Sequence, residues 1–353
     1  MVSEVTRPNG NRGSAKQRGL SLIELMIALL LSTLLTLGIL TMYLDSTETS
    51  QVSRSLARVQ ESGRIALDLV ARDLRMTGFA GCADPLQDLA PAYDASTLDE
   101  DFYRSSLRGA RVDGDDWDDL VDNVGIAALE ATAVADSDVL QIRRASGPSA
   151  TLDADMPAEN STISTDSDQT VTEFRIGENA LITNCVTADV FAVGDPDGFE
   201  DNEINHQPLS STYPEGSRVL HFNTTTYWVG DTGRTDQQGN TVWALYQNGL
   251  EVVTGVERLQ VLYGVREDDG NVRFENADDL TADDWNEIDV VQVGLLVSDE
   301  QNVLEAADTK NYDLPGLTVQ PAGTAGADAT YPADDRLRTT FTMTVNLRNN
   351  IEQ

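Results

Sequence analysis

The sequence predicts an α+β fold in which one long N-terminal helix packs against an antiparallel β-sheet head. Three observations predict it. An uncharged apolar run from Leu25 to Leu44 would span roughly 30 Å as a helix, which matches a bilayer core. An amphipathic pattern follows this run, and strand-like alternation dominates the rest of the chain. Because strands follow the helix instead of alternating with further helices, the sheet is expected to be antiparallel.

The helix is predicted to have two parts, a transmembrane or filament-core part over residues 20–44 and an amphipathic part over residues 45–78. We expect the first part to lie in a bilayer or filament and the second to pack on a globular head. The alternative is a membrane anchor with a coiled-coil stalk, which the lack of sustained heptads disfavours. Gly78 predicts the end of the helix. Apolar positions in the second part recur every three or four residues: Val52, Leu56, Val59, Gly63, Ala66, Val70 and Leu74.

Residues 79–353 are predicted to form one elaborated β-rich head with long acidic loops, because no interdomain linker is evident. Strand patterns occur at residues 138–142, 171–176, 219–222, 225–229, 242–246, 256–265, 288–297 and 339–347. Acidic or Gly- and Pro-rich segments are expected to be loops: residues 94–122, 145–169, 194–216, 267–284 and 306–334.

Composition excludes some classes of function. The chain carries 24 basic and 59 acidic residues, a formal net charge of −35, whereas nucleic-acid binding requires a basic stripe. The chain has only two histidines, His206 and His221, and therefore few candidate residues for a His-based catalytic triad or a metal centre with His ligands. Motifs of serine hydrolases, zinc proteases and P-loops do not occur, so we predict no enzyme activity and no cofactor. The alternative is glycoside hydrolysis by a pair of carboxylates, since acidic residues occur throughout the chain. His221 is expected to pack in the core, as are the tryptophans Trp117, Trp228, Trp243 and Trp285.

The N-terminus predicts membrane insertion with an unusual cleavage site. Residues 1–19 carry a net charge of +3, and Asp45 follows the apolar run, so the positive-inside rule places the N-terminus in the cytoplasm. No small-x-small site follows the run, as a secretory signal would require. A peptidase that cut after Gly19 would remove the basic leader and leave the helix attached. The amine of Leu20 would then lie one turn from Glu24, whose charge at the edge of an apolar span otherwise costs several kcal/mol. The alternative is a glutamate that snorkels to the interface.

Residues 18–26 (RGLSLIELM) resemble the prepilin signature of type IV pilins and type II secretion pseudopilins. The resemblance implies that a membrane prepilin peptidase cuts after Gly19 and that Leu20 becomes the N-methylated first residue. It also implies that Glu24 pairs with the N-terminal amine of a neighbouring subunit during assembly. The sequence departs from the family pattern in having leucine as first mature residue and no proline in the helix.

Four further segments, residues 64–82, 181–191, 250–265 and 335–349, resemble PilW-type minor pilins, which implies a type IV pilin-like fold. The implied role is to prime and join pilus assembly, in a tip or initiation complex with other minor pilins and the major pilin. Implied partners also include the inner-membrane assembly machinery and a tip adhesin. The implied route is a single-pass inner-membrane protein that then reaches the periplasm and the extracellular pilus. The alternatives are a type II secretion pseudopilin and a membrane-anchored exported binding protein.

The two cysteines, Cys82 and Cys185, would both lie in an oxidising compartment and are expected to form one disulfide. The alternative is two free buried thiols. Two acidic segments, residues 113–119 and 195–201, are rich in the hard oxygen ligands that calcium prefers. Neither matches the EF-hand spacing, and solvated surface is the expectation. The weak calcium candidates are Asp113, Asp115, Asp195 and Asp197.

Overall fold

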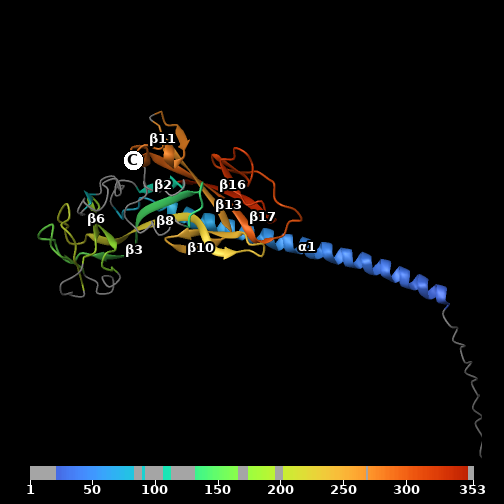
Figure 1. Cartoon of the computed structure of the whole chain (residues 1–353). Helices are drawn as coiled ribbons and strands as arrows, with labels where there is room; N and C mark the ends of the chain where they lie inside the picture. The colour runs from blue at the N-terminus through green and yellow to red at the C-terminus, as the bar shows by residue number, and fades with distance from the viewer. Residues whose placement is uncertain are drawn as a thin grey trace, which may run out of the picture. The chain divides into compact units, whose positions relative to one another are not determined.

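The computed structural model describes residues 21–82, 90–91, 106–112, 132–165, 174–194, 202–267 and 269–348. Its contacts divide the chain into two compact units, Met1–Gln51 and Val52–Gln353. One helix, α1 (Leu22–Leu74), contributes to both units, and the strands belong to the second (Figure 1).

The first unit consists of α1 from Leu22 onward, without any buried side chain up to Gln51 in this described part. Three threonine hydroxyls within its apolar run are satisfied locally. Thr33, Thr36 and Thr41 donate to backbone carbonyls three or four residues earlier, at 2.8 to 3.0 Å. Such bonds let polar side chains sit in an apolar helix without unpaired donors.

In the second unit α1 buries one face, and the buried positions differ in part from the predicted ones. Val59, Gly63, Ala66, Val70 and Leu74 are buried as predicted. The prediction was wrong for Leu56, which is 39% exposed. Polar side chains that the apolar pattern could not identify, at Ser55 and Asp73, are buried on the helix instead, because each finds a hydrogen-bonding partner in the head. The helix ends at Leu74, and a turn leads to Gly78 with φ 72°.

Within the described residues, the larger sheet has eight strands and is organised along β8 (Arg218–Thr235). One edge of β8 pairs with β3 (Asp138–Thr151), which pairs in turn with β2 (Leu107–Arg111). The other edge pairs first with β5 (Asn179–Thr183) and then with β9 (Thr241–Gln247). The remaining strands are β10 (Leu250–Thr254), β6 (Ala188–Ala192) and β1 (Ala90–Pro91), and of these pairings only β1 with β6 is parallel.

The second sheet has the order β12–β11–β13–β17 and is antiparallel throughout. Its strands are β12 (Val272–Glu275), β11 (Val256–Arg266), β13 (Ile288–Asn302) and β17 (Arg336–Asn346). The described residues also form two small sheets. One consists of β14 (Tyr312–Leu314), β15 (Leu317–Pro321) and β16 (Ala329–Tyr331), and the other of β4 (Ile163–Ser164) and β7 (Glu203–Ile204). Two 3₁₀ turns, η3 (Ala277–Asp279) and η4 (Asp284–Asn286), precede β13.

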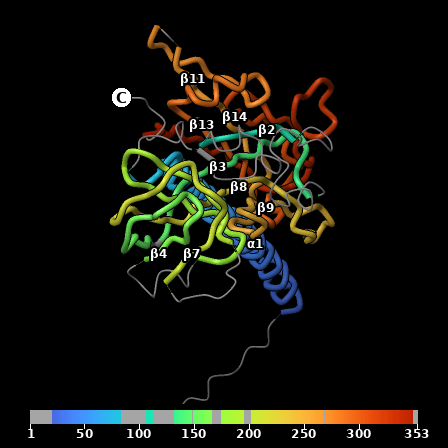
Figure 2. The backbone as a smooth tube through the Cα atoms, turned by 90° about the vertical axis from the view of Figure 1, so that its left-hand side faces the viewer, coloured from blue at the N-terminus to red at the C-terminus, as the bar shows by residue number. Residues whose placement is uncertain are grey.

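The main hydrophobic core joins the buried face of α1 to both sheets. It contains Val59 and Val70 from the helix, Tyr227 from β8 and Val261 and Val293 from the second sheet. A separate core around β4, β5, β6 and β7 lies at the other end of β8. Figure 2 shows β4 and β7 apart from β11 and β13, with β8 between them. The long strand β8 therefore connects two packed regions of one head.

Ser137, just before β3, and Asp138, the first residue of β3, join the two sheets by accepting hydrogen bonds from backbone amides of β11. The Ser137 hydroxyl accepts from the Leu259 amide at 3.0 Å, and the Asp138 carboxylate accepts from the Val261 amide at 2.6 Å. These amides lie on the stretch of β11 that β12 does not reach, because β12 pairs with residues 263–266. Burial raises the pKa of Asp138 to about 7, since desolvation outweighs the hydrogen bond from Val261.

Several predicted strands and loops need correction. Residues 219–222 and 225–229 form one strand, β8. The predicted strand at residues 171–176 was wrong for Phe174 to Ile176, which form a bend and a turn; the remainder lies outside the described residues. Residues 145–169 include the end of β3 and β4, residues 194–216 include β7, and residues 267–284 include β12. The predicted loop 306–334 contains β14, β15 and β16, which pack on Leu296 because β13 buries both of its faces.

Gly63 is required for close approach of α1 to the Phe341 ring, because a Cβ at this position would overlap three ring atoms. We expect Gly63→Leu to lower the free energy of unfolding by roughly 1–3 kcal/mol through overpacking. Adding Phe341→Ala should recover part of the loss. Chemical denaturation of both variants measures this. Gln60→Leu, on the exposed side of the helix, is the control, and an equally destabilised control would contradict the packing explanation.

The raised pKa of Asp138 predicts a pH-dependent stability. Between pH 4 and pH 7 the folded state holds a proton that the unfolded state has released, so this group makes the protein less stable as pH rises. The expected loss is on the order of 4 kcal/mol over this interval. Asp138→Asn should remove that component, as measured by denaturant midpoints against pH. Asp153→Asn, at an exposed position, should leave the wild-type profile unchanged.

Candidate functional site

The part of α1 before Asp45 is a continuous exposed apolar surface. Sixteen large apolar side chains from Leu22 to Leu44 are each at least 50% exposed. The helix is long and apolar enough to cross a membrane. A patch this large in a folded protein marks a membrane or protein contact. This segment is therefore the first candidate functional surface.

Glu24 lies in the first turn of this helix and is the sole charged residue from Ser21 to Leu44. Its side chain is exposed, and it makes no ion pair with the described part of the chain. The helix dipole favours a carboxylate at this end, but an apolar environment would still require a positive partner. Gly19 and Leu20, the predicted cleavage residues, lie outside the described residues.

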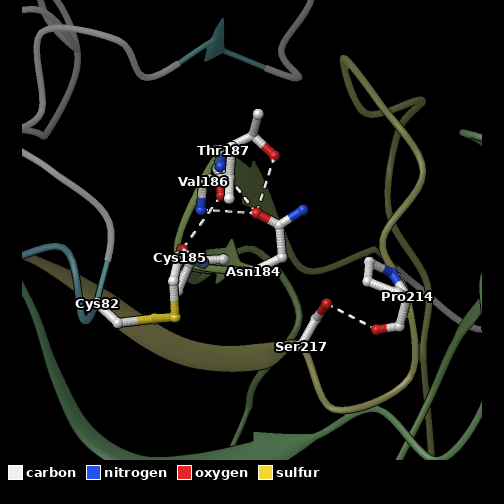
Figure 3. Close-up of a disulfide and its surroundings, with 8 residues drawn as sticks. Cys82, Asn184, Cys185, Val186, Thr187, Pro214 and Ser217 are labelled. Carbon is white, nitrogen blue, oxygen red and sulfur yellow. Dashed lines mark hydrogen bonds between the residues drawn. A yellow bond between two sulfur atoms is a disulfide. The ribbon is translucent and has the colours of Figure 1, made fainter.

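The turn that follows α1 is covalently attached to the larger sheet. Cys82 and Cys185, which the sequence analysis paired, form a disulfide between residues 103 apart in sequence (Figure 3). Cys185 occupies the hairpin between β5 and β6 at φ 70°, a conformation uncommon for a residue with a side chain. The Asn184 side chain holds this turn by accepting from the amides of Val186 and Thr187, at 2.9 and 2.8 Å.

Asp73 fixes the last turn of α1 to the larger sheet. Its carboxylate accepts from the Tyr227 hydroxyl at 2.7 Å and from the Gln247 amide nitrogen at 3.1 Å. Arg144 of β3 supplies the countercharge at 3.2 Å. Burial and the adjacent carboxylate raise the pKa of Tyr227, so its hydroxyl stays protonated and donates. Asp73 is thus a buried charge with a partner on each of three strands.

A second polar contact fixes the helix earlier along its length. Asp299 of β13 accepts a hydrogen bond from the Ser55 hydroxyl. It also accepts hydrogen bonds from Nε and Nη2 of Arg58, at 3.1 and 2.5 Å. Asp299 is buried, and Arg58 is half exposed. Such two-pronged contacts fix orientation as well as position. Together with Asp73, this contact sets the rotation of α1 about its axis.

Buried charges also hold the segment that contains β14, β15 and β16 against the second sheet. Arg338 donates to Glu257 through Nε at 2.7 Å and through Nη2 at 3.0 Å, and to Asp334 at 2.7 Å. Its guanidinium lies over the Tyr331 ring, 4.5 Å from the centroid. Arg336 is paired with Asp236 at 2.8 Å. The pairs of Arg338 with Glu257 and of Arg336 with Asp236 could not be predicted from local pattern, because they join residues 81 and 100 positions apart.

The other candidates from the sequence have structural roles or lie outside the described part. His221 stacks on Phe174 with ring centroids 4.2 Å apart. Trp228 and Trp285 are buried, and Trp243 is half-buried. The calcium candidates Asp113, Asp115, Asp195 and Asp197, together with Trp117, are outside the described residues. Within the described ranges, no group of three or more His, Cys, Asp or Glu side chains could hold a metal ion.

Two known protein families match parts of this chain. The model for the prokaryotic N-terminal methylation motif matches residues 14–40, which include the predicted cleavage site and Glu24. The model for the type IV pilus-assembly protein W family matches residues 227–349. Together the two matches support a PilW-family type IV minor pilin. No curated protein matches it.

The PilW match covers the end of β8, the second sheet and the buried arginines, and therefore the part of the head against which α1 packs. The α+β architecture, with one long apolar N-terminal helix and an antiparallel sheet domain, is that of a pilin-like protein. The methylation motif indicates processing by prepilin peptidase, membrane anchoring and then location in the pilus. Both matches indicate a structural protein.

The disulfide predicts a stability difference. In the chain-entropy model, closing a loop of this length contributes about 4 to 5 kcal/mol to the free energy of unfolding. We expect Cys82→Ser with Cys185→Ser to lower the denaturation midpoint of the head under oxidising conditions. Under reducing conditions the wild type should shift toward the double variant. A double variant as stable as the oxidised wild type would contradict a structural role for this bond.

Proposed function

We propose that this PilW-family protein is a minor pilin that primes type IV pilus assembly and joins the pilus through its N-terminal helix. The observation that carries the proposal is the exposed apolar stretch of α1 with a single carboxylate in its first turn. Such a helix can lie in lipid before assembly and among other apolar helices afterwards. Both environments bury the same side chains, so transfer between them requires no refolding.

Glu24 would align the helix of one subunit with the helix of its neighbour during this transfer. Prepilin peptidase would cut after Gly19, remove the positively charged leader and create an amine at Leu20. The Glu24 carboxylate of one subunit would then pair with the amine of its neighbour, and each pair would offset the cost of the other charge in an apolar core. Before cleavage the protein would be a single-pass inner-membrane protein with a cytoplasmic N-terminus.

The head would provide partner contacts outside the membrane. The polar contacts through Asp73 and Asp299 and the disulfide at Cys82 hold the second half of α1 on the head in one orientation. A head held in this way presents its surface at a defined rotation about the helix axis. We propose that its partners are other minor pilins and the major pilin in a tip or initiation complex, together with the inner-membrane assembly machinery and a tip adhesin.

Sheared fibres test the proposal directly. We expect the wild-type protein in the sheared fraction, with an N-terminal peptide mass that corresponds to methylated Leu20. The same form found only in membranes would contradict incorporation and would favour a type II secretion pseudopilin. A full-length form with Met1 in every fraction would contradict processing and would favour a membrane-anchored binding protein.

Two variants separate processing from assembly. We expect Gly19→Val to retain its leader, because a bulky side chain blocks the peptidase, and to be missing from fibres. Glu24→Ala should be cleaved normally but be depleted from fibres, since the charge pair is lost. Intact mass and immunoblots of sheared and membrane fractions measure both effects. Normal incorporation of Glu24→Ala would contradict the charge-pairing role, and Glu48→Ala, beyond the apolar run, is its matched control.

A further inference from the structure

A small cavity opens in the head between the second sheet and the segment that carries β16. Its volume is about 250 Å³. The half-buried Trp243 ring and Pro332, with exposed Ala322, stand at its rim, and Tyr331 is buried in its wall. Two charged side chains, Glu257 and Arg258, complete the lining.

Arg258 is a buried cation with an unused donor. Its side chain is 9% exposed, and its two terminal nitrogens donate to the backbone carbonyls of Ala135 and Thr330. Its Nε–H is buried and has no hydrogen-bond partner in the described part of the chain. Carbonyl groups are dipoles, so they solvate the guanidinium without neutralising its charge. A buried cation in this state gains free energy from an anion that supplies both the charge and the missing acceptor.

Two carboxylates, Glu257 and Asp136, act electrostatically on Arg258, but within the described part of the chain neither forms an ion pair or a hydrogen bond with it. Glu257 accepts hydrogen bonds from both Nε and Nη2 of Arg338, so its oxygen atoms are already paired with another cation. The two residues lie at a bulge, where the register of β11 against β13 shifts between Val256 and Arg258. Bulges re-aim side chains and recur next to binding sites. Here the bulge places Arg258 on the cavity wall beside an acid that is already paired.

We propose that this cavity binds a small organic carboxylate with a ring-sized body, whose carboxylate pairs with Arg258 and whose ring packs between Trp243 and Tyr331. The cavity is smaller than the roughly 300 to 1,000 Å³ of drug-sized ligand sites, which limits the ligand to about one ring. Aromatic walls with a few directed polar groups accept either an aromatic ring or the apolar face of a sugar ring. The chemistry is therefore that of an aromatic acid or of a uronic acid. The site does not depend on the role of the protein in the pilus.

Titration of the full chain in detergent micelles tests the site, with phenylacetate and glucuronate as probes. The experiment should be done near 0.15 M salt, where the net charge of −35 repels anions less. We expect saturable binding of at least one acid by calorimetry or by ligand-observed NMR. The neutral analogues phenylacetamide and glucose should bind about tenfold more weakly or worse. Preference for phenylacetate identifies an aromatic acid, and preference for glucuronate identifies a sugar acid.

Two kinds of variant locate the binding. Ala322→Trp fills the rim while leaving Arg258 intact, and it should weaken binding at least tenfold. Ala325→Trp, on an exposed residue of the same connection that does not line the cavity, should bind like the wild type. Arg258→Gln should also lose binding, whereas Arg258→Lys, which keeps the charge, should retain part of it. Absence of binding by both acids, equal binding of the neutral analogues, or unchanged binding by Ala322→Trp would each overturn the proposal.

Discussion

The burial of one face of α1 from Ser55 to Leu74 is the interaction on which the rest of the head depends. This face contributes to the same core as β8, β11 and β13, so neither sheet can complete its packing without the helix. The contact is mostly apolar, with Gly63 allowing close approach to Phe341. The polar contacts at Ser55 and Asp73 lie near its two ends. Apolar burial supplies the driving force, and these directed contacts select one rotation of the helix.

Charge is used in two ways in this acidic protein. In the described part of the chain most acidic residues are exposed to solvent, whereas a few are buried against arginine. Arg336 and Arg338 are almost fully buried, and each pairs with carboxylates from other elements. Because an unpaired buried charge is strongly unfavourable, such pairs tolerate few alternative arrangements. They therefore specify how the segment carrying β14, β15 and β16 attaches to the second sheet. Arg258 differs from these two arginines because, within the described part of the chain, its hydrogen bonds go to backbone carbonyls and none goes to a carboxylate.

The sheets also show how one strand can organise two packed regions. β8 pairs with β3 along its first ten residues, while its opposite edge changes partner from β5 to β9. The disulfide attaches the turn after α1 to the β5–β6 hairpin, and Asp73 attaches the helix to Tyr227 in the middle of β8. The end of the helix is thus connected to the larger sheet at two places, the β5–β6 hairpin and the middle of β8. These contacts hold the end of α1 against the head.

The features that depend on local pattern could be predicted from the amino-acid sequence. These features are the apolar run with Glu24, the amphipathic continuation with Val59, Ala66 and Val70, and most long strands. The periods of a helix and a strand are visible in the spacing of apolar residues within a short segment of sequence. The prepilin signature and the cysteine pair could also be identified from the sequence. Which polar residues are buried could not be predicted in this way, since Ser55, Asp73, Arg258 and Arg338 look like ordinary surface residues in sequence. Their burial depends on partners from distant elements. The same reason explains why residues 306–334 were predicted as a loop, because their short strands are stabilised by packing on Leu296 and by Arg338, which no local pattern encodes.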